Sequence, residues 1–241
     1  MIDAKRPRRP AAGGYARGDE TRLRIIDAAI ERFGEAGFDG ASTRDIAQRA
    51  GVNAPALQYY FENKEGLYRA CAEHIADETL AFFEPVSTHA RQVLAENGDA
   101  ERLIDAFIRI QETIADKMFT VRRDPDPRMF FAREQAGHEP GIASEVLQCR
   151  LRKPLNDLCA ALLGRLTGCP PNDPRNLVRM MSLNGQLLVF HIARRTTLTL
   201  FGWNDIDAEK AELIKSTVRA QTRQLLESWH REANRKGGEA A

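Results

Sequence analysis

Apolar side chains recur every three or four residues along most of this chain, which is the spacing of one face of an α-helix. The pattern predicts helices over 21–37, 64–83, 87–96, 100–121, 128–137, 142–166, 173–200 and 207–234. Pro85 is expected to end the second of these helices, and Pro154 to kink the helix over 142–166. No segment shows the two-residue alternation of a β-strand, so we predict an all-α fold.

Residues 41–64 carry two shorter helical patterns with a glycine between them. Ser42 or Thr43 and then Asn53 are suited to cap these helices, because a side-chain oxygen at that position accepts a hydrogen bond from a free backbone amide. Gly51 is expected to end the first helix, since glycine adopts a positive φ at little cost. Two short helices joined by such a turn predict a helix-turn-helix, whose second helix enters the major groove of DNA.

The predicted recognition helix runs from Asn53 to Phe61 and offers several kinds of DNA contact. Its small N-terminal residues allow a close approach of the backbone, its tyrosine hydroxyls can reach phosphates, and helix N-termini bind phosphate themselves. Asn53 and Gln58 are the best candidates for reading bases, because amide side chains pair with adenine. The predicted DNA-binding residues are Ser42, Thr43, Asn53, Ala54, Pro55, Ala56, Gln58, Tyr59, Tyr60 and Lys64.

Three short motifs in this region occur together. Gly37-Phe38 ends the first helix, Thr43-x-x-Ile-Ala-x-x-Ala-Gly-Val52 follows, and Phe61-x-x-Lys-x-x-Leu67 closes the segment. This combination resembles the N-terminal signature of the TetR family of bacterial transcription repressors. The resemblance implies a three-helix DNA-binding head. The chain departs from the commonest recognition helix of that family at Asn53, Ala54, Pro55 and Gln58, so the resemblance does not give the operator sequence.

A second set of motifs lies further along the chain. Phe131-Ala-Arg-Glu-Gln135 is followed by Pro140, and Gly185-Gln-Leu-Leu188 by His191, Ala193, Arg194 and Gly202-Trp203. These motifs are similar to the C-terminal domain of the CecR-like branch of the family, although His138-Glu139 separate the Arg-Glu-Gln segment from its proline. The resemblance implies a ligand-responsive regulator, whose neighbouring genes are often drug-efflux or transport systems.

The cluster Arg133-Glu134-Gln135 beside two phenylalanines has two interpretations. It can be the polar anchor of an otherwise apolar ligand pocket, or a hydrogen-bond network that fixes helix packing. The apolar candidates can equally be plain core. The predicted ligand-binding residues are Phe107, Ile110, Ile114, Met118, Phe130, Phe131, Arg133, Glu134 and Gln135.

The last two long helices carry more apolar surface than a peripheral pair needs. In the TetR family such helices form a four-helix interface with a second copy, which sets two recognition helices about 34–36 Å apart and predicts a palindromic operator. Alternatively, they only cover the core of the monomer. The predicted interface residues are Met180, Met181, Leu187, Leu188, His191, Val218, Leu225 and Leu226.

The domain organisation follows from these segments and from composition. Residues 1–18 are rich in Pro, Gly and Arg and have a side-chain charge of 5 − 1 = +4, so we expect a disordered arm that either contacts DNA or is only a tail. The head is predicted over 19–66, a ligand-binding and dimerisation body over 67–234, and a disordered tail over 235–241. The whole chain has a net charge of +1, so DNA binding has to use a local basic face.

Other functional classes are disfavoured. The sequence shows no Ser-His-Asp arrangement, no convincing pair of carboxylates and no glycine-rich phosphate loop, so we expect neither an enzyme nor a cofactor. Its four cysteines lack metal-site spacing and are interpreted as reduced thiols, although a thiol switch stays open. No apolar run reaches about 18 residues and no signal peptide is evident, which predicts a cytoplasmic protein.

Together, these features predict a homodimeric repressor that a small molecule releases from a palindromic operator. The alternative is a binding module for a ligand or a partner protein that has lost specific DNA reading. The sequence does not encode whether the regulator represses or activates.

Overall fold

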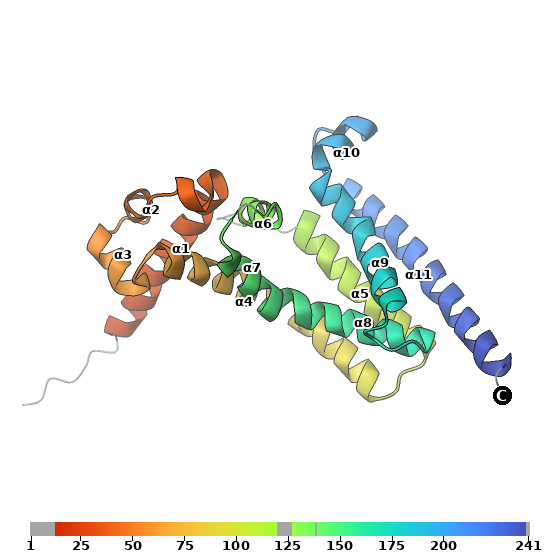
Figure 1. The fold of residues 1–241 in the computed structure, drawn as a ribbon. Helices are drawn as coiled ribbons and strands as arrows, with labels where there is room; N and C mark the ends of the chain where they lie inside the picture. Colours follow the sequence, from red (N-terminus) through yellow and green to blue (C-terminus); the bar gives the residue numbers. More distant parts are fainter. Residues whose placement is uncertain (1–12, 120–126, 138, 240–241) are drawn as a thin grey trace, which may run out of the picture. The chain divides into compact units, whose positions relative to one another are not determined.

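A computed structural model describes residues 13–119, 127–137 and 139–239, and over these ranges the chain is helical without any β-strand (Figure 1). This confirms the predicted all-α fold. Of the disordered arm predicted over 1–18, residues 13–18 are helical and the others lie outside the described residues, as does most of the polar break around 122–127. The disordered tail predicted over 235–241 is helical as far as Glu239. In chain order the helices are α1 (Gly13–Gly40), α2 (Thr43–Arg49), α3 (Ala54–Phe61), α4 (Lys64–Ala95), α5 (Ala100–Phe119), α6 (Arg128–Gln135), α7 (Gly141–Leu147), the π-helix η1 (Gln148–Arg152), α8 (Lys153–Thr167), α9 (Pro174–Ile192), α10 (Arg194–Phe201) and α11 (Ala208–Glu239).

The chain divides into two compact units. The first unit consists of Met1–Ala76 and Arg123–Leu147, and the second of Asp77–Arg122 and Gln148–Ala241. The first unit is therefore larger than the head predicted over 19–66. It gains the beginning of α4 and the pair α6–α7, because α6 packs against α1 and α7 packs against α6.

The first unit has a small apolar core around the helix-turn-helix. α1 contributes Ile26 and Phe33, α2 contributes Ile46, α3 contributes Leu57, and α4 contributes Leu67, all of them buried. These positions recur on one face of each helix, as the sequence pattern requires. The core fixes α2 and α3 against α1 and α4, so the opposite faces of α2 and α3 are left to solvent.

The predicted helix end at Pro85 is wrong, because α4 continues through this proline to Ala95. A proline leaves the carbonyl four residues earlier without its helical partner. That residue, Ala81, is exposed, and so is Pro85, so water can bind the carbonyl that the helix does not use. The same helix carries the chain from the first unit into the second.

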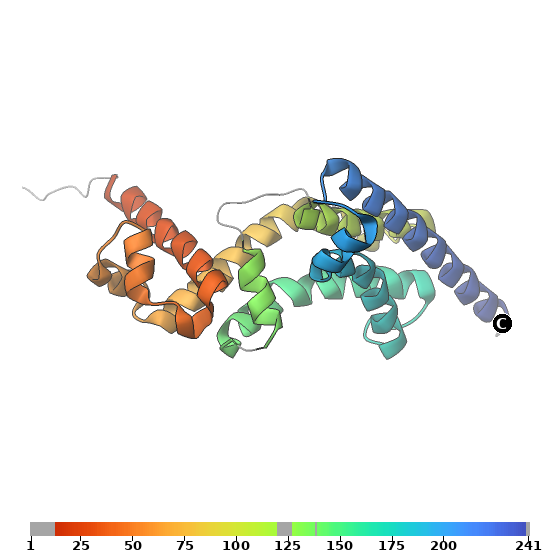
Figure 2. The same ribbon diagram turned by 90° about the horizontal axis from the view of Figure 1, so that it is seen from above.

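The second unit is a helical bundle built on α5, α8, α9 and α11 (Figures 1 and 2). The predicted inward face of α5 is confirmed at Leu103, Ala106, Phe107 and Ile110, which are all buried. They belong to an apolar cluster with residues of α4, α8 and α9. A second cluster joins the end of α5 to α9 and α11, and its buried residues are Ala115, Leu187, Ile206, Ala211, Ile214 and Val218.

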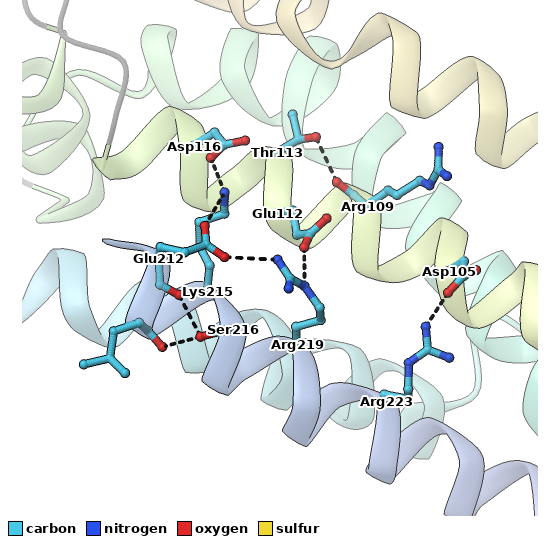
Figure 3. Close-up of polar contacts among 11 residues, drawn as sticks. Asp105, Arg109, Glu112, Thr113, Asp116, Glu212, Lys215, Ser216, Arg219 and Arg223 are labelled. Carbon is cyan, nitrogen blue, oxygen red and sulfur yellow. Dashed lines mark hydrogen bonds and ion pairs between the residues drawn. The ribbon is translucent and has the colours of Figure 1, made fainter. Parts of the chain in front are cut away.

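A row of ion pairs runs beside this apolar contact between α5 and α11 (Figure 3). Arg223 pairs with Glu101 at 2.7 Å and also contacts Asp105, and Arg219 pairs with Glu112. Lys215 pairs with Asp116 at 2.8 Å. Acidic residues of α5 thus face basic residues of α11 along the contact, although each exposed pair adds only about 0.2–1 kcal/mol.

Two breaks interrupt long helical patterns in the second half of the chain. The helix predicted over 142–166 contains the π-helical turn η1, which ends two residues before Pro154 and includes Arg150, whose carbonyl the proline ring would meet in an α-helix. The helix predicted over 173–200 is instead two helices, because Ala193 leaves helical geometry at φ −92° and ψ 32° between α9 and α10.

Candidate nucleic-acid interface

The helix-turn-helix has the caps that the sequence predicts. Ser42 Oγ accepts a hydrogen bond from the amide of Asp45 at 3.0 Å, and Asn53 Oδ1 accepts one from the amide of Ala56 at 2.9 Å. The turn between the helices passes through Gly51 at φ +67°. Each cap satisfies a helix amide that would otherwise lack a partner, so both helices begin at defined residues.

A groove of about 650 Å³ lies on the solvent side of these helices. It brings together six of the ten predicted DNA-binding residues, from the beginnings of α2, α3 and α4: Ser42, Thr43, Ala54, Pro55, Gln58 and Lys64. Asp39 and Glu62 also line the groove. Its attraction for phosphate therefore depends on Lys64, on the two hydroxyls and on the amides at the helix N-termini.

The other four predicted residues lie on α3 or at its cap, outside the lining of this groove. Tyr59 projects into solvent with 83% of its surface exposed, and its ring meets the half-buried Tyr60 edge to face at 5.2 Å. Ala56 is half-buried, and Asn53 uses its carbonyl oxygen for the cap. Asn53 therefore has only its NH₂ group left for a base, which makes Gln58 the better candidate.

Lys64 is held in place by the end of α1. Its Nζ lies 3.4 Å from the carbonyl oxygen of Asp39 and 4.6 Å from the centre of the Phe38 ring. A cation over an aromatic face is attracted to the ring. The position of Lys64 in the groove thus depends on where Phe38 lies.

Two arginines of α2, both absent from the predicted DNA-binding residues, add positive charge near this surface. Arg44 is exposed on α2, one residue after Thr43, and the only sequence signal for it was its polar position on a helix beside the recognition helix. Arg49 is less available, because it pairs with Glu31 at 2.9 Å and Glu35 at 3.0 Å. The hydrogen bonds from Arg49 and then Arg32 lower the pKa of Glu35.

The predicted ligand-binding residues fall into two groups. Four of them lie on α5 in the second unit, where Phe107 and Ile110 are buried and Ile114 and Met118 are half-buried. The other five lie on α6 in the first unit, namely Phe130, Phe131, Arg133, Glu134 and Gln135. The structure therefore does not gather them into one compact unit.

The polar groups on α6 are already engaged within the protein. Arg133 donates hydrogen bonds to the carbonyls of Gly34 and Glu35 on α1, at 2.7 and 2.8 Å. Glu134 is buried and accepts a hydrogen bond from the Ser144 hydroxyl at 2.6 Å, while Gln135 is exposed. For Arg133 and Glu134 these contacts favour the interpretation as a packing network.

Half of the predicted interface residues face inward. Met180, Leu187, Val218 and Leu226 are at most 5% exposed within the protomer, so they have almost no surface to offer a second copy. Periodicity placed them on apolar faces without telling which face is the inner one. Met181, Leu188 and Leu225 are exposed and His191 is half-buried. The neighbouring exposed apolar residues are Leu177, Val178, Val189, Ile192, Leu200, Phe201 and Leu213, from α9, α10 and α11.

The described residues hold no cluster of three or more side chains suited to a metal ion, and none of their helices is long and apolar enough to cross a membrane. All four cysteines are free. Burial raises the pKa of Cys71 well above its ordinary value and that of Cys159 to about 12, so these two thiols are unreactive. Cys149 is exposed and Cys169 half-buried.

Comparison with known proteins places this geometry in a family. A model of the tetR family of bacterial regulatory proteins matches residues 25–71, and a model of the C-terminal domain of the transcriptional dual regulator CecR matches residues 103–228. CecR of Shigella flexneri is 34% identical over 203 residues, which are 84% of this chain and 89% of that protein.

Solved structures agree on the fold. A transcriptional regulator of Pseudomonas aeruginosa PAO1 has a TM-score of 0.58 at 17% identity, covering 89% of this chain and 94% of its own. AibR, solved with isovaleryl coenzyme A and operator DNA, has a TM-score of 0.56 at 15% identity, covering 83% and 97%. The chain therefore belongs to the TetR family of helix-turn-helix DNA-binding transcriptional regulators, which are not enzymes, and carries a C-terminal domain of the CecR type.

Proposed function

We propose that the protein is a homodimeric repressor that leaves a palindromic operator when a small molecule binds its body. The observation that carries the DNA-binding part is the groove formed by the beginnings of α2, α3 and α4, with Gln58 and Lys64 in its lining. We propose that α3 lies in the major groove, Gln58 reads a base, and Ser42, Thr43 and Lys64 contact phosphates.

The proposed dimer uses the exposed apolar side chains of α9–α11. Met181, Leu188 and Ile192 follow one another at helical spacing on α9 and are 59%, 39% and 74% exposed. Several exposed apolar side chains on one helix favour an interaction site. A two-fold dimer would place the two recognition helices about one turn of DNA apart, roughly 34–36 Å.

The proposal extends to the effector and to the regulated genes. Regulators of this family bind operator DNA and effector ligands, and AibR was solved with an acyl-coenzyme A thioester. We propose that the effector acts on this protein through the helical body, by binding more tightly to a conformation with low DNA affinity. We expect efflux or transport genes among its targets and an active protein in the cytoplasm, where the DNA is.

A genomic selection tests this function directly. The purified protein is mixed with fragments of its own genome at physiological salt, and the retained fragments are sequenced. We expect one palindromic site or a few, including one near its own gene. Retention that is independent of sequence and disappears with salt would refute specific DNA reading and would favour a partner-binding module.

Two protein variants, assayed for binding to the selected duplex, distinguish base reading from phosphate contact. Gln58→Ala is expected to relax the preference at one base position in each half-site, at a cost of about 1–3 kcal/mol. Arg44→Ala is the matched control, since it is expected to weaken binding evenly across sequences and to make the dependence on salt shallower. Unchanged sequence preference in Gln58→Ala would remove Gln58 from the proposed base contacts.

A further inference from the structure

Two side chains from the α6–α7 segment form hydrogen bonds with the backbone at the end of α1. The Arg133 guanidinium donates to the carbonyls of Gly34 at 2.7 Å and Glu35 at 2.8 Å. The Glu139 carboxylate accepts a hydrogen bond from the amide of Phe38 at 2.6 Å. The Glu139 side chain is only 8% exposed, and its second oxygen lies 3.9 Å from Arg133 Nη1. We call Arg133 and Glu139 the clasp, because they bind the backbone on both sides of Gly37.

The backbone at Gly37 is shaped to receive the clasp. Gly37 has φ 76° and ψ 175°, a conformation that is essentially restricted to glycine. A Cβ at this position would lie 2.8 Å from Glu139 Oε1 and 3.2 Å from Arg133 Nη1. The missing side chain therefore makes the room in which the carboxylate and the guanidinium approach α1.

The clasp reaches the proposed DNA surface through Phe38. The Phe38 ring stacks on Phe33 at 5.9 Å and meets Tyr68 edge to face at 5.1 Å. The ring also lies beside Lys64, whose ammonium is 4.6 Å from the ring centre and 3.4 Å from the carbonyl oxygen of Asp39. Lys64 and Asp39 line the groove. Phe38 therefore connects the clasp to the groove, because its amide binds Glu139 and its ring contacts Lys64.

The segment that carries the clasp is itself firmly anchored. Glu134 on α6 is bound by the Ser144 hydroxyl on α7, and the Phe130 ring lies 5.0 Å from Tyr68 on α4. Burial raises the pKa of the Tyr68 hydroxyl, and the charges of Glu139 and Glu134 add to this effect. The segment thus meets the DNA-binding helices through a packed aromatic cluster and not only through the clasp.

We propose that Arg133 and Glu139 are positioning residues for DNA binding, which hold the α1 end so that Phe38 presents Lys64 to the operator. The inference rests on the proposed function and extends it to residues that do not line the DNA groove. It also gives the Arg133 of the Arg-Glu-Gln motif a task other than ligand binding. Arg133 and Glu139 would thus support the DNA-binding surface without lining it.

The test compares two neutralised glutamates on the same segment of the full-length protein. Glu139→Gln weakens the hydrogen bond to Phe38 and the attraction to Arg133, whereas Glu145→Gln removes the same charge from an exposed position on α7. Affinity for the duplex recovered in the genomic selection is measured by fluorescence anisotropy, at a temperature where circular dichroism shows every variant folded. We expect Glu139→Gln to raise Kd at least about tenfold, and Glu145→Gln to stay within about twofold of the wild type.

A double-mutant cycle with Lys64→Gln distinguishes positioning from a general loss of structure. If the clasp acts through Lys64, Glu139→Gln should cost less than about threefold in a chain that already lacks Lys64. Equal losses with and without Lys64 would overturn the proposed route. A Glu139→Gln protein that binds the duplex like the wild type would overturn the inference altogether.

Hydrogen exchange in the free protein separates failure of this inference from failure of the proposed function. The Phe38 amide should exchange faster in Glu139→Gln than in Glu145→Gln, because it loses a carboxylate acceptor. Equal exchange would overturn the clasp without any use of DNA. A wild-type protein that selects no duplex would refute the proposed function, and with it the role of the clasp in DNA binding.

Discussion

Replacing Gly37 by alanine should destabilise the first unit more than an ordinary glycine substitution does. A non-glycine residue in this region of φ and ψ costs about 1–3 kcal/mol. The new Cβ would lie 2.8 Å from Glu139 Oε1, a separation at which the carboxylate has to move. Loss of its charged hydrogen bond to Phe38 adds about 1.5–3 kcal/mol. We therefore expect Gly37→Ala to lower the free energy of unfolding by about 2.5–6 kcal/mol, a large share of the 5–15 kcal/mol typical of a domain.

Gly168→Ala is the control for backbone strain alone. Gly168 ends α8 at φ 68° and ψ 8°, and a Cβ there would meet nothing within 4 Å. It should cost only about 1–2 kcal/mol. Urea unfolding of both variants, followed by circular dichroism, gives the comparison. If Gly37→Ala lowers the free energy of unfolding no more than Gly168→Ala does, the close contact between Gly37 and the clasp does not contribute to stability. Glu139→Ala should lower the free energy of unfolding less in the Gly37→Ala background than in the wild type, because Gly37→Ala already breaks the hydrogen bond between Phe38 and Glu139.

Three further predictions concern the rest of the molecule. Leu188→Asp should convert the proposed dimer to a monomer, as measured by analytical ultracentrifugation. Leu23→Asp, at a similarly exposed leucine of the first unit, should leave the dimer intact. A Leu188→Asp protein that is still dimeric would exclude this surface as the dimer interface. Burial lowers the pKa of Lys117, so protonation of this lysine opposes folding, and stability should rise with pH until the lysine is neutral in the unfolded chain as well. Lys117→Met should therefore raise Tm at pH 7. An unchanged or lower Tm would contradict this reasoning. The hydrogen bonds from Arg49 and Arg32 lower the pKa of Glu35, so this carboxylate stabilises the fold above its unfolded pKa and the contribution is lost as pH falls through the lower folded value. Glu35→Gln should flatten the acid limb of a stability–pH curve, and an unaltered acid limb would show that solvent screens these pairs.

The helix-turn-helix and the inner face of α5 could be predicted because their signals are local. A cap, a glycine turn and a three- or four-residue apolar period all lie within one or two turns of the residues they organise. The hydrogen bond from Phe38 to Glu139 joins residues 101 positions apart, and neither residue carries a pattern that identifies its partner. The clasp therefore becomes visible only in the three-dimensional structure.

Burial explains the other differences between prediction and structure. Helix α9 is apolar on more than one side, so periodicity alone could not separate Leu187, which is buried in the protomer, from Leu188, which is exposed. The effect of Pro85 depended on whether its helix was exposed at that point, which sequence does not show. The break at Ala193 has no proline or glycine to announce it.

The first unit is discontinuous in sequence, and this has a consequence for synthesis on the ribosome. Its N-terminal part ends at Ala76, but the segment with the clasp ends at Leu147, after 46 residues of the second unit have been inserted. At about 5–20 residues per second, the ribosome adds the missing piece roughly 4–14 seconds later. During that interval the nascent helix-turn-helix lacks α6 and α7, so the carbonyls of Gly34 and Glu35 and the Phe38 amide have no clasp. A polypeptide released early would carry a recognition helix without the support that completes its DNA-binding unit.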